Sequence, residues 1–494
     1  MSQLQIGWAQ RDISTEEPVT IIGQANLRIS KGCADKLTLT ALSMRDGDTV
    51  IFLSIDATQI TSTLFLEIKE KIARKDPSVP TDKLIVNATH THTTGGFFRG
   101  CGWFSYEERD EYEDENIDTL PNPLPYYPVE KYRAFVSDMA SDAVVEAYRS
   151  MTDGQVCYGY GTESIGASRR VVYEDEGYAQ MYGDTKKPTF SGFEGGVDPK
   201  INLLYTFDMG GKLTGAVINV ACPSQVSEND DMLSADYWHE TRELIRREHG
   251  DIYILPQCAA AGDAAPCSLY YGRAHVRRLF MLHGDAKNPE RMEIAEKLRH
   301  TFAETLGWAK GEMFTTMPIS HRTETIHLSK RLVTDEEKEE YEKKLQTLKE
   351  TPYITEGMDA EQMWEENTTH IGAIAQCHMI LDRYEEDKTT KTFPMEMHTV
   401  GMGPIAFCTS CFELYTDYMH RIQARSPFVQ TFVLQLCGIP QKNGGNHYLA
   451  TKRAMEHGGY SAYVFSNIIS ADGGQELVEK TLTALNDLYP VSNP

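Results

Sequence analysis

Two histidines separated by one residue stand at the end of an apolar run, and their spacing could serve a metal ion. The segment Thr89-His90-Thr91-His92-Thr93-Thr94-Gly95-Gly96 follows Leu84-Ile85-Val86. Residues i and i+2 of a strand lie on one face, and the glycine pair lets the backbone turn away tightly. Two imidazoles aimed at one point suit a catalytic metal site. Two separately hydrogen-bonded histidines are the alternative, and the short pattern leaves both open.

Three further segments offer groups that could join these histidines. Cys222 ends a predicted strand, where it could be a soft thiolate ligand for zinc or a small buried apolar residue. Glu413 opens a predicted helix, where an acid also compensates the helix dipole. The Gly-rich turn 443–448 leads into a predicted helix and could equally be a simple loop and cap.

The elements that must position these groups alternate between strand and helix in the first half of the chain. Strands are predicted at 37–43, 49–55, 83–88, 201–207, 213–220, 252–256, 396–400, 405–408 and 428–436, and helices at 64–74, 132–150, 234–249, 412–424 and 475–488. The Gly-containing connection 208–212 is typical of a hairpin. Mixed hairpins and crossovers favour an α/β (α+β) fold with mixed sheets packed with helices.

Two stretches have the composition of insertions. The segment 101–127 is acidic and aromatic, and it is either a solvated surface loop or a substrate lid that leaves the sheet after the histidines. The segment 334–384 is rich in Glu, Lys, Met and Leu at helical spacing, which predicts a helical hairpin.

Composition limits the classes of function. The 494 residues are 41% hydrophobic and 24% charged, with a formal net charge of -24, which disfavours nucleic acid and anionic membranes as partners. Neither a signal peptide nor an apolar run of about 20 residues is visible. Ten scattered cysteines are typical of reduced thiols, so we expect a cytoplasmic protein without membrane partners. A homo-oligomer is one of the states that the sequence leaves open.

Taken in order, these motifs resemble the neutral/alkaline non-lysosomal ceramidase family over nearly the whole chain. The matching segments are 6–13, the strand ending at Asp56, 89–96, 166–170, 221–224, 234–237, 260–266, Glu413, 426–428, 448–451 and 458–460. No single motif is decisive, but about eight of them stand in the family's order. The resemblance implies one catalytic domain over residues 1–494, with the fold of the ceramidase N-terminal domain.

The resemblance also implies one zinc ion held by two histidines, a glutamate and a tyrosine. These positions fall on His90, Cys222, Glu413 and Tyr448, so that Cys222 replaces the second histidine. A thiolate can still close a zinc site, although its negative charge would make the metal a weaker Lewis acid. The alternative is that the site has lost its metal and that Cys222 is merely buried.

In the family, the second histidine of the pair and an arginine face the substrate, and here they match His92 and Arg169. Both could stabilise an oxyanion, although the pair Arg169-Arg170 leaves the register open by one residue. The serine that ceramidases need falls on Ala265, which can neither attack nor donate a hydrogen bond. Asp263 remains as a candidate for orienting the loop or accepting a proton. The family's immunoglobulin-like domain has no counterpart, and ceramide itself is not the expected substrate.

We therefore expect a zinc hydrolase that acts through metal-bound water on a small-molecule polar substrate, with the amide, ester or glycosidic bond unresolved. Aromatic residues flank the motifs and favour a carbohydrate derivative: Trp103, Phe104, Tyr106, Tyr270 and Tyr271. A metal-assisted lyase or isomerase of a sugar or sugar acid, and a non-catalytic metal-binding or scaffold homologue, are the alternatives. The place of His447, in the site or at the surface, stays open.

Overall fold

A large mixed sheet forms the centre of the computed structural model, which describes residues 3–100, 112–121, 123–174, 177–442 and 447–489. In spatial order its strands are β14 (Tyr253–Cys258), β13 (Leu213–Val220), β12 (Lys200–Asp208), β7 (Thr152–Thr162), β1 (Gln5–Asp12), β4 (Thr38–Asp46), β5 (Asp48–Ile55) and β6 (Leu84–Ala88). The pairs β13–β14 and β5–β6 are parallel, and the other neighbours are antiparallel. The expected hairpin connects β12 and β13.

A smaller sheet packs against one face of the large one. Its strands are β16 (Ile319–Ser329), β17 (Thr392–Met402), β18 (Ile405–Thr409) and β20 (Gln430–Leu434), with β18 and β20 parallel. Alternation along β5 turns Phe52 toward this sheet and Leu53 toward the opposite face. The rings of Phe52 and Phe407 lie 4.9 Å apart between the sheets. An apolar layer from both sheets therefore joins them face to face.

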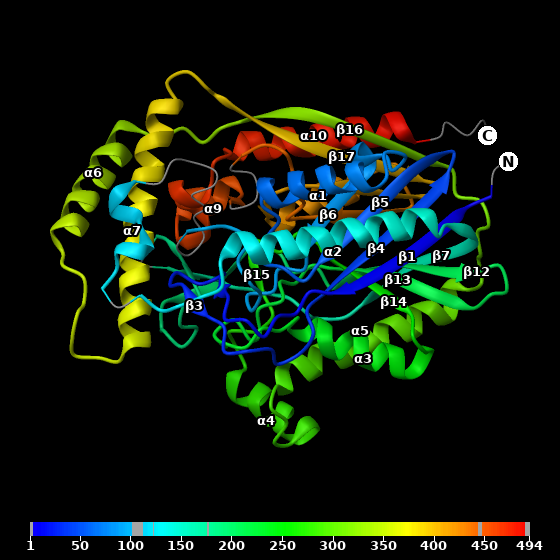
Figure 1. Ribbon diagram of the computed structural model, residues 1–494, viewed down its shortest axis with the longest axis horizontal. Helices are drawn as coiled ribbons and strands as arrows, with labels where there is room; N and C mark the ends of the chain where they lie inside the picture. Colours follow the sequence, from blue (N-terminus) through cyan, green and yellow to red (C-terminus); the bar gives the residue numbers. More distant parts are fainter. Residues whose placement is uncertain (1–2, 101–111, 122, 175–176, 443–446, 490–494) are drawn as a thin grey trace.

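Helices cover the two outer faces (Figure 1). On the large sheet lie α1 (Ser62–Lys75), α2 (Val129–Arg149), α3 (Tyr237–His249) and α5 (Pro289–Ala309), and on the small sheet α8 (Thr416–Arg425) and α10 (Ala471–Leu488). This confirms the predicted α/β (α+β) class with mixed sheets. In the described part of the chain, no helix has the length and apolar character needed to cross a bilayer.

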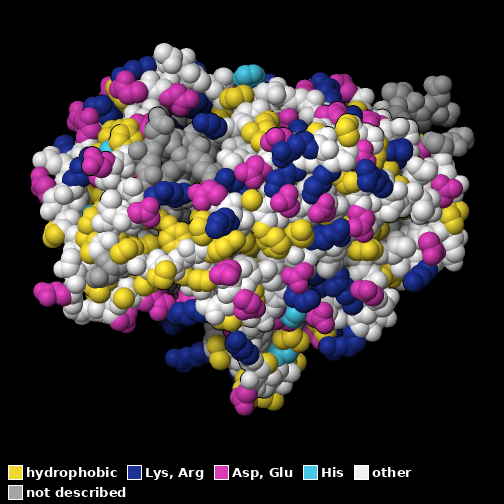
Figure 2. Space-filling view, viewed as in Figure 1, with side chains coloured by type: hydrophobic (Ala, Val, Ile, Leu, Met, Phe, Trp, Pro, Cys, Tyr) yellow, Lys and Arg dark blue, Asp and Glu magenta, His cyan; other side chains and the backbone are white. Residues whose placement is uncertain are grey.

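Two helical features stand outside these layers. The segment predicted as a helical hairpin forms α6 (Asp335–Glu350) and α7 (Ala360–Glu386) at one end of the molecule (Figure 1). Helix α4 (Gly272–His283) projects from the body (Figures 1 and 2) and leaves Val276, Phe280 and Met281 more than half exposed. The sequence analysis did not predict α4.

Short elements complete the loops around the sheet ends. They are β2 (Thr20–Ile21), β3 (Arg28–Ile29), β8 (Ala167–Ser168), β9 (Arg170–Tyr173), β10 (Ala179–Met181), β11 (Phe190–Glu194), β15 (Ala264–Ala265), β19 (Glu413–Leu414), β21 (Tyr448–Leu449) and α9 (Lys452–His457). Strand β19 corrects the prediction that Glu413 opens a helix. The Glu413 amide donates to the His447 carbonyl. Helix α8 begins only at Thr416, where the Thr416 amide donates to the Asp263 carboxylate.

Candidate active site

The first group of the site is His90, which lies two residues beyond the end of β6. Its backbone has a φ of 65°, a left-handed conformation that a residue other than glycine rarely adopts. The ring Nδ1 lies 2.7 Å from the carbonyl of Thr58, so Nδ1 carries a hydrogen and donates it to that carbonyl. That Nε2 lies 3.4 Å from a carboxylate oxygen of Glu413. His90 is thus buried, oriented by the backbone and aimed at Glu413.

Glu413 and Tyr448 stand side by side because β19 and β21 pair in parallel with these two residues in register. Both side chains are buried or nearly so. Burial by itself raises the pKa of Glu413, but the neighbouring His90 and Arg169 hold that pKa below its ordinary value. Burial, with the Glu413 charge beside it, raises the pKa of Tyr448 well above its ordinary value. The pair therefore presents a carboxylate and a neutral phenol.

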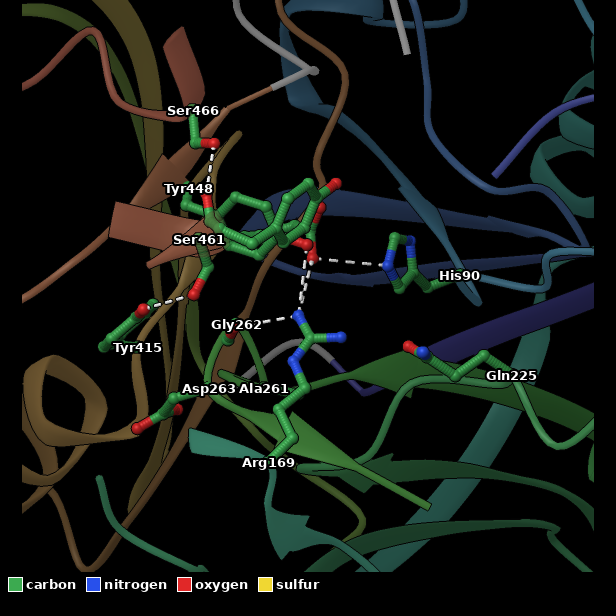
Figure 3. A network of polar contacts seen from close by, with 12 residues as sticks. His90, Arg169, Gln225, Ala261, Gly262, Asp263, Tyr415, Tyr448, Ser461 and Ser466 are labelled. Carbon is green, nitrogen blue, oxygen red and sulfur yellow. Dashed lines mark hydrogen bonds and ion pairs between the residues drawn. The ribbon is translucent and has the colours of Figure 1, made fainter. Parts of the chain in front are cut away.

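Arg169 closes this group from the opposite side (Figure 3). Its Nη2 donates to the Tyr448 hydroxyl at 3.1 Å and to the Gly262 carbonyl at 3.0 Å, and it lies 3.8 Å from Glu413. Arg170 instead forms a buried ion pair with Glu194 at 2.7 Å. Of the two neighbouring arginines, Arg169 is the one that contacts Glu413 and Tyr448, which favours it over Arg170 as the site residue.

His92 is the fifth member of the cluster. Its Nε2 lies 3.3 Å from Nε2 of His90, and the two rings are nearly perpendicular. Gly23 packs so closely that an added Cβ would lie 2.7 Å from the ring, and its φ of +113° also requires glycine. Burial and the neighbouring His90 lower the pKa of His92 well below its ordinary value, so the ring is neutral.

Cys222 lies next to this cluster in the backbone but turns its thiol elsewhere. The adjacent Ser224 hydroxyl donates to the Thr89 carbonyl at 2.9 Å, which joins the two segments. The Cys222 thiol, however, interacts with Tyr237 and Cys258, and burial raises its pKa well above the ordinary value. Within the described ranges, no three His, Cys, Asp or Glu side chains are grouped as a metal site. The role of Cys222 as a metal ligand stays a prediction.

Asp263 fastens a loop to a helix. One carboxylate oxygen accepts from the Thr416 amide at 2.9 Å and from the Thr416 hydroxyl at 2.7 Å. Figure 3 shows this carboxylate pointing away from Arg169 and His90. Its main-chain neighbour Gly262 supplies the carbonyl that accepts from Arg169. Of the two roles proposed for Asp263, the contacts favour orientation of the loop.

The loop around Asp263 is also held to the Glu413 strand. The side-chain oxygen of Gln435 accepts from the amides of Ala261 and Leu414, each at 3.0 Å. Ala265 pairs with Ala167 in a two-stranded ladder and is fully buried. His447 is also buried, and burial lowers its pKa to about 3. It therefore does not face solvent.

Three polar residues beside the cluster were not anticipated. The Gln225 side-chain amide donates to the Tyr182 hydroxyl and to a Glu228 carboxylate oxygen, both at 3.0 Å. Glu228 lies 3.6 Å from Nδ1 of His92. A signal for Gln225 was present, because it directly follows the segment 221–224, but nothing in the local pattern pointed to Tyr182.

Five aromatic residues were assigned to sugar recognition, and the structure describes two of them. Trp103, Phe104 and Tyr106 lie outside the described residues. Tyr270 and Tyr271 are exposed beside α4, and the Tyr270 ring packs 5.7 Å from that of Phe193. Their predicted role in binding a carbohydrate stays a prediction.

No protein-family model matches the chain. A stretch of 172 residues is 24% identical to neutral ceramidase of Pseudomonas aeruginosa, and it covers 35% of this chain and 22% of that protein. The crystal structure of neutral ceramidase from Pseudomonas aeruginosa matches at a TM-score of 0.66 and 17% identity, over 99% of this chain and 76% of that one. A ceramidase complexed with C2 matches at the same TM-score and 15% identity, with the same coverage. The fold is that of neutral ceramidase, and the chain resembles that protein as a distant, ceramidase-like relative.

Proposed function

We propose that this chain is a zinc-dependent hydrolase of a small polar substrate. One observation supports this above the others: three potential donors from separate parts of the chain, His90, Glu413 and Tyr448, lie together in a buried site beside Arg169. Burying these polar groups costs free energy, and apolar side chains would fill the same space without that cost. Such a cluster is typical of a functional site.

The donor set fits a zinc ion at three of its four proposed ligands. The 3.4 Å between His90 Nε2 and Glu413 is close to the roughly 3.4 Å expected between two tetrahedral ligands of one zinc. The Thr58 carbonyl that holds His90 Nδ1 is the outer-shell partner typical of a metal-binding histidine. Cys222 is a less suitable zinc ligand in its present surroundings, because burial opposes loss of its thiol proton. A bound metal would favour the thiolate.

When bound, zinc would supply Lewis acidity and a water that is nucleophilic near neutral pH. The chain's own residues would do the rest. Burial alone would lower the pKa of Arg169, but the Tyr448 and Tyr182 hydroxyls and the Glu413 carboxylate raise it, so Arg169 keeps its charge and can donate to an oxyanion. His92, neutral and beside His90, can donate or accept one hydrogen bond at the reacting group.

The substrate class follows from the same residues. Since Ala265 removes the serine that ceramidases carry, we do not propose ceramide as the substrate. The scissile bond is an amide, an ester or a glycosidic bond, and a carbohydrate derivative remains our preferred candidate. A cytoplasmic location, and the lack of nucleic-acid and membrane partners, are part of the same proposal.

Metal content, measured by elemental mass spectrometry on chelator-free protein, tests this function. About one zinc per chain supports the proposal, and a sharp loss in Cys222→Ala would identify the thiol as a ligand. Cys157→Ala is the matched control, because this buried thiol lies in β7. A fully folded chain without stoichiometric metal would contradict the proposal and favour the scaffold alternative. Labelled water that does not enter the product would favour the lyase or isomerase.

A further inference from the structure

A second set of polar side chains faces the three proposed metal donors, and we call it the Gln225 wall: Tyr182, Gln225 and Glu228. Gln225 stands at its centre and is only 4% exposed. Its amide nitrogen is bound to both neighbours, at 3.0 Å in each case. Because a carboxylate only accepts hydrogen bonds, the contact with Glu228 fixes the orientation of the amide. The three side chains therefore form one connected unit.

This wall is joined to the proposed catalytic groups at both ends. At one end, Glu228 lies 3.6 Å from Nδ1 of His92. At the other end, the Tyr182 amide donates to the Arg169 carbonyl at 2.8 Å, so the two residues are joined through the main chain. The wall and the His90 side thus border the same site.

The wall offers an acceptor that has no partner. The side-chain oxygen of Gln225 is buried and accepts no hydrogen bond from the described residues. Figure 3 shows the end of the Gln225 side chain turned toward the Arg169 guanidinium, with no direct bond between them. Arg169 in turn keeps an unpartnered donor at Nε. Buried polar groups in native proteins are paired, so an unpaired one next to a site calls for a ligand or a water.

The Gln225 side-chain oxygen and the Arg169 guanidinium together determine which ligand fits. A hydroxyl can donate to the Gln225 oxygen and at the same time accept from the Arg169 guanidinium. An ammonium group cannot accept, and the charge of Arg169 would repel it. Glu228 adds a second acceptor whose side chain is 23% exposed and therefore reachable. The surroundings thus favour a neutral hydroxyl-bearing group over a cation or an alkyl chain.

We propose that the Gln225 wall binds a hydroxyl group of the substrate and selects hydroxylated substrates over alkyl ones. The inference rests on the proposed function, and it names the substrate class of that site. Gln225, Glu228 and Tyr182 are then specificity residues, with Tyr182 positioning the Gln225 amide. The reacting carbonyl would lie on the Arg169 and His92 side.

Two small amides of nearly equal size test this proposal: N-(2-hydroxyethyl)acetamide and N-propylacetamide, which differ by a hydroxyl in place of a methyl group. Binding of each to the full chain is titrated by saturation-transfer NMR, which requires no turnover. We expect the wild type to prefer the hydroxyl compound by about tenfold, the size of one buried hydrogen bond. Gln225→Met should reduce this preference to less than about twofold, because it keeps the volume and removes the acceptor.

Two further variants keep the test decisive if Gln225→Met folds poorly. Tyr182→Phe removes only the hydroxyl that holds the amide, and we expect an intermediate preference. Gln346→Met is the matched control, because Gln346 forms the same kind of bond to Glu350 on the exposed face of α6. It should leave the preference unchanged.

Equal binding of the two compounds, or no binding of either, would overturn the proposal, as would an unchanged preference in Gln225→Met. The proposed function fails separately. A hydroxyl preference in a chain that holds no zinc would support the wall and contradict the zinc hydrolase. A chain that holds zinc but shows no preference for the hydroxyl compound would support the zinc hydrolase and contradict the role of the wall.

Discussion

The two sides of the site are built differently. On one side, His90 lies two residues beyond the end of β6 and Glu413 pairs with Tyr448 across β19 and β21, so nearby main-chain hydrogen bonds set their positions. On the other side, the Gln225 wall stands on loops, and side-chain bonds join its members. Strand ends hold reacting groups precisely, whereas loops change readily between relatives. The first side therefore suits chemistry common to a fold, and the second suits selection of a substrate.

The largest effect should come from the first side. Glu413→Gln removes the only proposed ligand that is negatively charged in the unbound site, so zinc should fall from about one per chain to a small fraction. Any hydrolysis should fall at least about a thousandfold with it. Glu228→Gln, on the wall, should keep its zinc in the same elemental measurement. Equal zinc contents in the two variants would remove the distinction between the sides.

The neighbouring arginines give the next contrast. Arg169→Met should lower any hydrolysis by about 10²–10³-fold with zinc retained, because the group that donates to the oxyanion is lost. Arg170→Met removes the buried partner of Glu194, which keeps only the more exposed His457 and Arg453, and should lower the free energy of unfolding by about 1.5–3 kcal/mol. Urea unfolding and an activity assay on both variants check this. Similar activity losses with similar stabilities would contradict the assignment of Arg169 to the site.

The effect of Glu228→Gln on the free energy of unfolding should depend on pH. Burial raises its pKa above the ordinary value of 4.5, so the folded state binds this proton more tightly than the unfolded state. This contribution to stability is fully present below pH 4.5 and is lost as the pH rises through the raised pKa. Glu228→Gln should therefore gain stability relative to the wild type between pH 4 and pH 7. Thermal unfolding across that range measures the difference, with exposed Glu304→Gln as the control that should show none.

The smallest effect concerns one hydroxyl of the wall. Tyr182→Phe removes the hydrogen bond that the Gln225 amide donates and should lower the free energy of unfolding by about 0.5–1.5 kcal/mol. Chemical denaturation of the variant beside Tyr160→Phe, another exposed tyrosine, provides the comparison. If Tyr182→Phe loses no more free energy of unfolding than Tyr160→Phe, the Tyr182 hydroxyl does not hold the wall in place.

Much of the fold was predictable because its signals are local. The strands and helices around the site appear within a few residues of their predicted bounds, since apolar periodicity determines which face is buried. Glu413 was placed wrongly, at the start of a helix. Its strand exists only through pairing with Tyr448, which is distant in the sequence. The segment that became α4 carried no clear periodicity, and α4 packs on the body through little more than Leu279.

The sequence by itself determined the residue types of the site and the strand end that carries His90 and His92, because spacing and turn chemistry are short-range properties. Only the tertiary structure decided where the neighbouring side chains point. Cys222 and Gln225 belong to one loop, yet Cys222 packs with Tyr237 in the apolar core while Gln225 turns toward Arg169. Long-range bonds such as Ser224 to Thr89 set that loop, and no local pattern encodes them.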